Sequence, residues 1–134
     1  MKIAADTNVL LRAIIGDDAA QSRQAQAELA RAQAIAIAVP VLCELVWVLA
    51  KGYKIPQQEI VATVERLIDS ANVLVNRPAA EAGLAMLRAG GDFADGAIAY
   101  EGSWLGADSF VSFDRKAVKL LRAQGKAARL PERT

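Results

Sequence analysis

The sequence predicts an α/β fold, a single domain built on a parallel sheet with helices on both faces. Short apolar runs alternate with stretches of helical periodicity along the whole chain, as in strands joined by helical crossovers. The chain has 134 residues, 54% of them apolar, which is enough for one buried core. No linker, repeat or low-complexity segment divides it, so we expect residues 1–134 to form one domain with a basic tail from about 125.

The first half of the chain predicts two strands and four helices. A strand is expected at 2–6, ending at Asp6, and a helix at 7–15. The segment 16–33 places an aspartate at a cap position before alanine-rich helical spacing, and 34–39 reads as a buried strand. Pro40 is expected as the first residue of a helix that ends near Gly52. Pro56 then opens a helix whose apolar positions recur at helical spacing: Ile60, Val64, Leu67 and Ile68.

The second half predicts a third strand at 72–75, a helix at 78–89, a break at the glycine pair 90–91 and a helix at 93–105. A fourth strand is expected at 109–113 and a last helix at 114–123, followed by a short edge strand at 128–130. In such sheets the functional site lies beyond the carboxyl ends of the strands. Asp6 and Asp114 both fall there.

The composition excludes several classes of site. The sequence has no histidine, which rules out Ser-His triads, imidazole bases and histidine-ligated zinc. Cys43, the single cysteine, lies in an apolar run and is expected to be a small core residue of a reduced intracellular protein. The N-terminus does not resemble a signal peptide, and the longest apolar stretch, 34–50, is too short for a membrane span. We therefore expect a cytoplasmic protein.

The charge is unevenly distributed. Residues 115–134 contain seven Lys and Arg and one Glu, a local charge of +6, whereas the first 114 residues carry −5. A basic end beside an acidic body suits a protein that approaches a polyanion while carrying carboxylates of its own. A solvated helix face and tail is the alternative interpretation.

Two carboxylates stand where apolar residues are expected. Glu44 has only apolar neighbours at helical spacing, and an isolated buried carboxylate costs several kcal/mol unless it is paired. The alternative is a partly exposed Glu that supports the first helical turn. Asp95 shares its predicted helix face with Ile98, Ala99 and Gly102, so it is expected to face inward.

Helix capping explains the other acids at least in part. Asp92 follows the glycine pair and could accept the free N–H groups at the start of the next helix, and Asp6 and Asp114 could each cap a helix. If four acids converged at one sheet edge, they would repel one another without a counter-charge. Hard divalent cations, Mg²⁺ or Mn²⁺, match a ligand set made only of oxygen atoms. This pattern favours metal-dependent phosphodiester hydrolysis.

Four motifs together resemble a PIN domain, and more closely a VapC-type toxin of bacterial toxin-antitoxin pairs. They are "DTNVLLR" at 6–12, "LCELVWVL" at 42–49, "GGDFADGAIA" at 90–99 and "SFDRKA" at 112–117. They span nearly the whole chain in the order and spacing of the family. The resemblance implies an α/β/α fold around a parallel sheet and a Mg²⁺- or Mn²⁺-dependent endoribonuclease that acts on structured RNA, commonly tRNA or ribosomal RNA.

The resemblance also assigns roles to residues. Asp6, Glu44, Asp95 and Asp114 match the catalytic, metal-binding acidic quartet, and Asn8 and Ser112 match positions that often support the site through hydrogen bonds. Asp92 is expected to be a cap or to support the site. Family members are usually homodimers that a cognate antitoxin holds inactive. From the charge pattern, we expect four residues to hold the RNA backbone: Arg115, Lys116, Lys119 and Arg122.

Two residues depart from the family pattern, and neither departure removes a ligand. Ser112 stands where Thr is commoner, and Gly96 stands where Ala is commoner. Glycine lowers helix propensity by ~1 kcal/mol relative to alanine, so at most it is expected to loosen the turn that holds Asp95.

Two other functions compete with the nuclease interpretation. A phospho-acceptor receiver domain needs an acidic pair after its first strand and an aspartate after its third, whereas this chain has "DTN" and "NVLVN" at those places. The second rival is a PIN-like module that binds RNA or an antitoxin without significant cleavage. Metal-dependent RNA cleavage by the purified protein distinguishes it from a nuclease.

Overall fold

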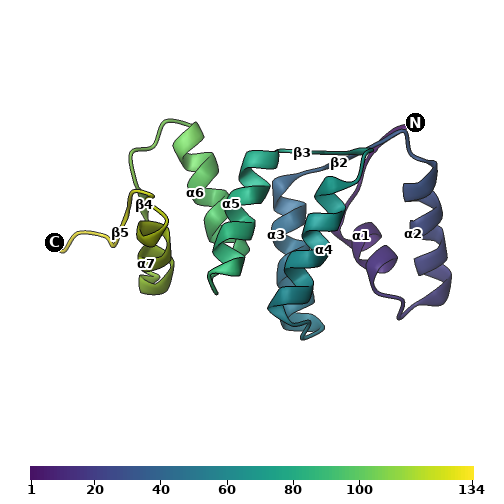
Figure 1. The fold of residues 1–134 in the computed structure, drawn as a ribbon, viewed down its shortest axis with the longest axis horizontal. Helices are drawn as coiled ribbons and strands as arrows, with labels where there is room; N and C mark the ends of the chain where they lie inside the picture. The colour runs from purple at the N-terminus through teal and green to yellow at the C-terminus, as the bar shows by residue number, and fades with distance from the viewer. The chain divides into compact units, whose positions relative to one another are not determined.

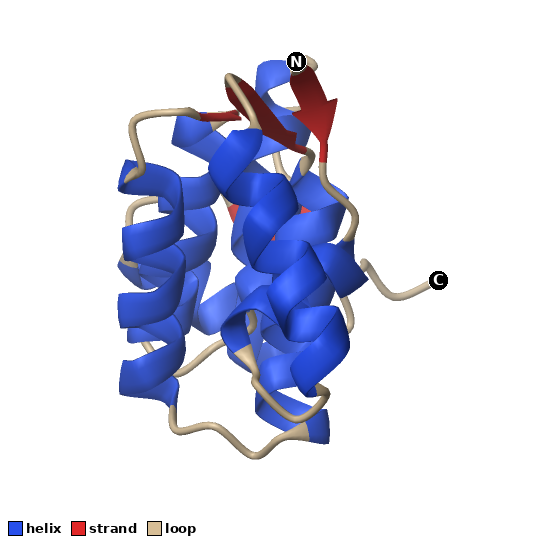
Figure 2. Cartoon of the chain, turned by 90° about the vertical axis from the view of Figure 1, so that its right-hand side faces the viewer, coloured by secondary structure: helices blue, strands red, loops and turns tan.

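The computed structural model describes all residues, Met1–Thr134, and divides the chain into two compact units. The first comprises Met1–Asn76 and the second Arg77–Thr134. Figure 1 labels the elements of both units along the chain. The strands are short, and helices make up most of the chain (Figure 2). No helix is long and apolar enough to cross a membrane.

The first unit carries a parallel sheet of three strands in the order β1-β2-β3. Ile35 of the central strand lies opposite Ile3 and Val73 of its neighbours. The elements of this unit are β1 (Lys2–Ala4), α1 (Thr7–Ile14), α2 (Ala19–Arg31), β2 (Ala34–Ile37), α3 (Val39–Trp47), the π-helical turn η1 (Val48–Gly52), α4 (Gln57–Asp69) and β3 (Val73–Val75).

The predicted apolar patterns account for the core of this unit. Ile60, Val64 and Ile68 of α4 are all buried, as their helical spacing predicts. On β2, Ile35 and Ile37 are buried, which confirms the buried strand. Leucines from α1, α3 and η1 complete the core: Leu10, Leu42, Leu45 and Leu49.

The second unit consists of three helices and a two-stranded parallel ladder. Its elements are α5 (Arg77–Arg88), α6 (Phe93–Trp104), β4 (Phe110–Val111), α7 (Arg115–Ala123) and β5 (Ala128–Arg129). β4 pairs with β5 in the register Phe110 opposite Ala128. One face of α7 is buried in a cluster of Met86, Ala117, Val118, Leu121 and Ala128.

Helices α5 and α6 pack side by side, and glycines let their backbones approach (Figure 1). A Cβ at Gly83 of α5 would lie 2.6 Å from the buried ring of Phe93 on α6. A Cβ at Gly96 of α6 would lie 2.9 Å from the carbonyl carbon of Ala82 on α5. Gly96 is therefore a packing residue, and the expectation that it merely loosens a turn is wrong.

The α/β class with parallel strands is confirmed, because all three strand pairs are parallel. Two local predictions need correction. The fourth strand was expected in the same sheet as the first three, whereas β4 pairs with β5, the predicted short edge strand. The helix expected to begin at Pro40 begins one residue earlier, at Val39, and its last turn is π-helical.

Candidate functional site

A shallow groove of about 640 Å³ lies at the carboxyl ends of the three strands in the first unit. Residues that follow each strand line it, including Asp6 after β1, Ala38 after β2 and Asn76 after β3. Asp6 is the only charged residue in this lining. The predicted position of Asp6 beyond a strand end is therefore confirmed.

Asp6 also caps the following helix. Its Oδ1 accepts a hydrogen bond of 2.9 Å from the backbone N–H of Val9, in the first turn of α1. Asn8 stands exposed in the same turn. A cap uses one carboxylate oxygen, so the exposed Asp6 side chain keeps a second oxygen for another partner.

Glu44 lies on α3 of the first unit, but it is not buried. The side chain is exposed, as are those of Pro40 and Trp47 on the same helix. The prediction of a buried carboxylate is wrong here, because the apolar positions next to Glu44 in helical spacing do not all face the core. Leu42, Leu45 and Val46 form the buried face instead.

In the second unit, Asp92 and Asp95 lie at the start of α6. Asp92 is the N-cap, and its Oδ1 accepts a hydrogen bond of 3.1 Å from the N–H of Ala94, which confirms the predicted cap. Asp95 is half-buried in the first turn, with no hydrogen bond and no ion pair. Burial, and then the charges of Asp92 and Asp114, raise the pKa of the Asp95 carboxyl group.

Asp114 is the N-cap of α7 and receives support from a second predicted residue. Its Oδ1 accepts a hydrogen bond of 3.1 Å from the N–H of Ala117. The N–H of Asp114 donates to Oγ of Ser112 at 3.0 Å. Ser112 thus fixes the backbone that carries the Asp114 carboxylate, as expected of a supporting residue.

The structure brings the acids of the second unit close enough to interact electrostatically. Asp95 experiences the charges of both Asp92 and Asp114. Asp6 and Glu44 belong to the first unit. Within either unit, no three acidic or cysteine side chains are arranged as a ready metal site. Convergence of all four predicted acids remains a prediction.

The donor set around Asp95 fits a hard divalent cation. Oxygen atoms are the only donors that these acids offer, and Mg²⁺ and Mn²⁺ prefer oxygen ligands. No Lys or Arg neutralises Asp95, and its two interacting charges are both negative. A bound cation at this place would relieve the repulsion among the three carboxylates. In an ordinary structural ion pair, a Lys or Arg side chain has that role.

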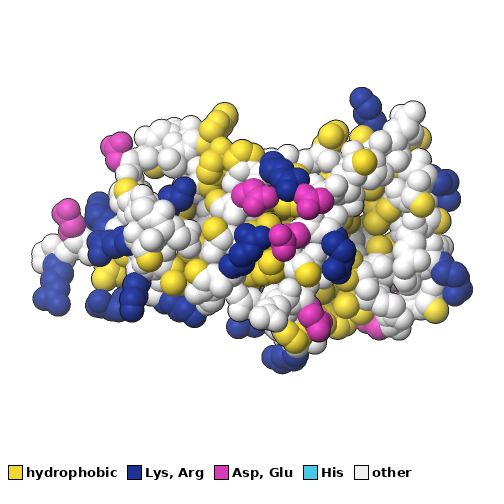
Figure 3. All heavy atoms as spheres, viewed as in Figure 1, with side chains coloured by type: hydrophobic (Ala, Val, Ile, Leu, Met, Phe, Trp, Pro, Cys, Tyr) yellow, Lys and Arg dark blue, Asp and Glu magenta, His cyan; other side chains and the backbone are white.

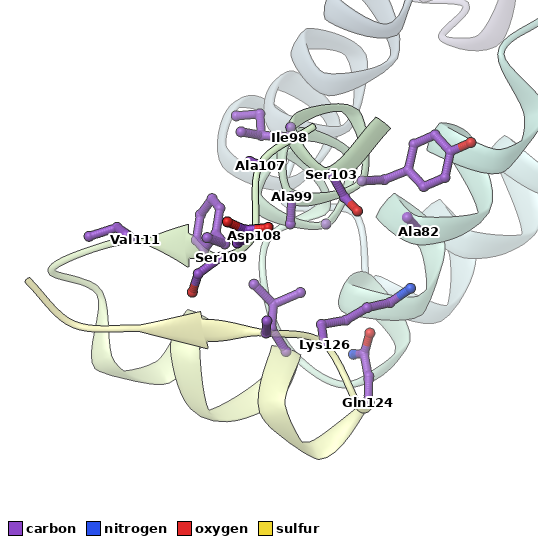
Figure 4. Close-up of a pocket in the computed structure, with 16 residues that line it drawn as sticks. Ala82, Ile98, Ala99, Ser103, Ala107, Asp108, Ser109, Val111, Gln124 and Lys126 are labelled. Carbon is purple, nitrogen blue, oxygen red and sulfur yellow. The ribbon is translucent and has the colours of Figure 1, made fainter. Parts of the chain in front are cut away.

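A separate cavity of about 450 Å³ lies in the second unit between α6, β4 and the segment that joins α7 to β5 (Figure 4). Ser103 of α6 lies across it from Gln124 and Lys126. Asp108 is the only acid in its lining, and Asp92, Asp95 and Asp114 do not contribute to it. This cavity is therefore not where chemistry of the predicted carboxylates would take place.

Two residues that line the surfaces described are not among the site residues that the sequence predicts by name. Asn76 lines the groove in the first unit, and a polar residue directly after a predicted strand was the available signal. Arg129 lines a groove of the second unit together with residues of α7. The basic excess of residues 115–134 includes Arg129, but only the pairing of β5 with β4 shows where it lies.

Comparison with known proteins identifies one family. A family model described as PIN domain matches residues 3–122. No curated protein matches the chain. PIN domains are generally nucleases that use divalent metal ions, and their α/β/α fold is consistent with the helices and parallel strands observed.

Proposed function

Because the chain belongs to the PIN domain family, we propose that it is a Mg²⁺- or Mn²⁺-dependent endoribonuclease of the VapC toxin type that cleaves structured cellular RNA. The observation that carries this proposal is the environment of the Asp95 carboxylate. This carboxylate is half-buried, interacts with two further carboxylates and has no cationic partner in the chain. A carboxylate kept in such surroundings is typical of metal and catalytic sites.

The proposal assigns metal binding and catalysis to Asp6, Glu44, Asp95 and Asp114. A divalent cation, when bound, supplies an activated water and neutralises charge on the phosphoryl oxygen. Asp95 and Asp114 would hold the ion with oxygen atoms, while the Ser112 hydrogen bond keeps the start of α7 in place. Asp92 would support Asp95 by fixing the first turn of α6. The net reaction is hydrolysis of a P–O bond, which leaves a phosphomonoester on one fragment and a hydroxyl group on the other.

A toxin of this type is expected to act in the cytoplasm as a homodimer that a cognate antitoxin inhibits, and both partners are part of the proposal. The support is a set of exposed apolar side chains. Trp104, Leu105 and Phe113 of the second unit expose 74%, 71% and 87% of their surface. Large exposed apolar side chains are typical of protein interaction sites.

The test of the activity is RNA cleavage by the purified chain. Structured RNA labelled at its 5′ end should be cut with Mg²⁺ or Mn²⁺ and remain intact with EDTA, and Asp95→Asn should abolish the cleavage. Binding of intact RNA by a pure preparation that never cleaves it, with any divalent ion, would instead identify a PIN-like binding module. Sequencing the 5′ ends of cellular RNA after induction would then identify the target.

A further inference from the structure

Basic residues gather on one side of the second unit. Lys and Arg side chains crowd the left of the space-filling view, over α7 and β5 (Figure 3). A groove of about 420 Å³ lies among them, with Val118 and Leu130 as its apolar part. Its four other lining residues are all cationic: Arg115, Lys119, Arg122 and Arg129.

We propose that this groove binds phosphate groups of the RNA backbone, outside the carboxylate cluster. The proposal rests on the proposed nuclease function for the identity of the polyanion. Arg129 lines the groove together with three of the residues expected to hold RNA, whereas Lys116 does not line it.

The spacing of the cations supports a backbone-binding groove. Arg115, Lys119 and Arg122 are separated by four and three residues on α7, so they form a stripe along one helix face. At about 1.5 Å of rise per residue the stripe is roughly 10 Å long, which suits a chain of phosphates rather than a single ion. Arg129 extends the charge onto β5.

Hydrogen bonds hold two of the guanidinium groups in place. Nε of Arg122 donates to the carbonyl oxygen of Ala128 at 2.7 Å. Nη1 of Arg129 donates to the carbonyl oxygen of Leu130 at 3.3 Å. Each guanidinium keeps other N–H donors for a ligand, and a pre-oriented fork of donors is well suited to phosphate.

None of the four cations has an acidic partner. No ion pair involves any of them, although the chain forms pairs elsewhere, such as Arg12 with Asp17 at 3.0 Å. Arg115 and Lys119 are like charges one turn apart, and Arg115 lies in the first turn of α7, where the helix dipole disfavours a cation. Helix stability explains Arg122, which lies in the last turn, but not Arg115 or Lys119, whereas binding of an anion accounts for all three.

The experiment measures binding of an RNA hairpin by fluorescence anisotropy in EDTA, so that cleavage cannot interfere. Each lost phosphate contact should lower the slope of log K against log salt by about 0.7 for single strands and about 0.9 for a duplex. Over a fourfold change in salt concentration, each lost contact should therefore make the fold-change in the binding constant smaller by a factor of roughly three. Lys119→Ala and Arg129→Ala should each show this loss, and Lys119→Arg should restore the wild-type slope.

Lys116→Ala is the matched control, because it removes a charge that is also exposed and lies on the same helix, but outside the groove. Matching melting curves exclude a folding defect. Equal slopes for Lys116→Ala and Lys119→Ala would overturn the proposal. It would also be overturned if the wild-type protein bound polyglutamate but did not bind RNA. Failure of cleavage with intact groove-dependent binding would count against the nuclease function alone, and normal cleavage with unchanged slopes against the groove alone.

Discussion

Replacing Gly96 with alanine tests the packing that positions Asp95. A Cβ at residue 96 would lie 2.7 Å from Cγ of Met86 and 2.9 Å from the carbonyl carbon of Ala82, and closer still to the carbonyl oxygen of Ala82. Carbon atoms in ordinary contact lie about 3.5–4.0 Å apart. Because part of the obstacle is the backbone of α5, a change of side-chain rotamer cannot make the room. The two helices must move apart.

Two opposing effects set the magnitude. Overpacking of a buried contact costs about 1–3 kcal/mol, and an immobile backbone obstacle puts this site in the upper part of that range. Alanine gains about 1 kcal/mol of helix propensity over glycine. The free energy of unfolding should therefore fall by about 1–2 kcal/mol. For a chain of this size the melting temperature should fall by roughly 3–8 °C.

The assay is thermal melting followed by circular dichroism, with Gly102→Ala as the control. Gly102 lies on the same helix, but a Cβ there would meet no atom within 4 Å. It should gain about 0.5–1 kcal/mol of stability from helix propensity alone. The pair thus separates steric contact from propensity within one helix. A Gly96→Ala protein that melts at or above the wild-type temperature would refute the close packing of α5 and α6.

Three further outcomes are expected. Asp95→Asn should lower RNA cleavage by orders of magnitude while the fold survives. Asp92→Asn keeps a good capping residue and should retain substantial activity at matched folded concentration. The reverse result would exchange the roles of the two residues. Mn²⁺ should raise the melting temperature at neutral pH relative to EDTA, because the cation binds the native state and relieves repulsion around Asp95; identical midpoints would contradict metal binding. Tyr53→Phe removes the 2.8 Å hydrogen bond that is the main cause of the lowered pKa of Asp17. A carboxyl group whose pKa is lowered in the folded state stabilises the fold at pH values above its unfolded pKa of 3.8, and this stabilisation is lost as the pH falls through the folded pKa. Tyr53→Phe should therefore melt at a lower temperature than the wild type at pH 6, and the difference should shrink toward pH 2.

The sequence by itself determined the features that depend on near neighbours along the chain. Helix caps at Asp6, Asp92 and Asp114 were predictable because a cap bonds to a backbone N–H two or three residues away. The buried stripe of α4 was predictable because its spacing repeats every turn. The order of strands and helices, and with it the α/β class, follows from the same local signals.

Tertiary structure decided the features that depend on contacts between distant segments. An apolar neighbourhood in the sequence did not bury Glu44, because burial depends on which helix face meets the core. The pairing of β4 with β5 brings Arg129 beside the cations of α7, and strand partners are chosen by packing rather than by strand propensity. Helix propensity alone makes Gly96 a weak helix former, whereas its packing role depends on the backbone of α5, which lies against it. Each of these contacts joins residues far apart along the chain, and local periodicity carries no information about them.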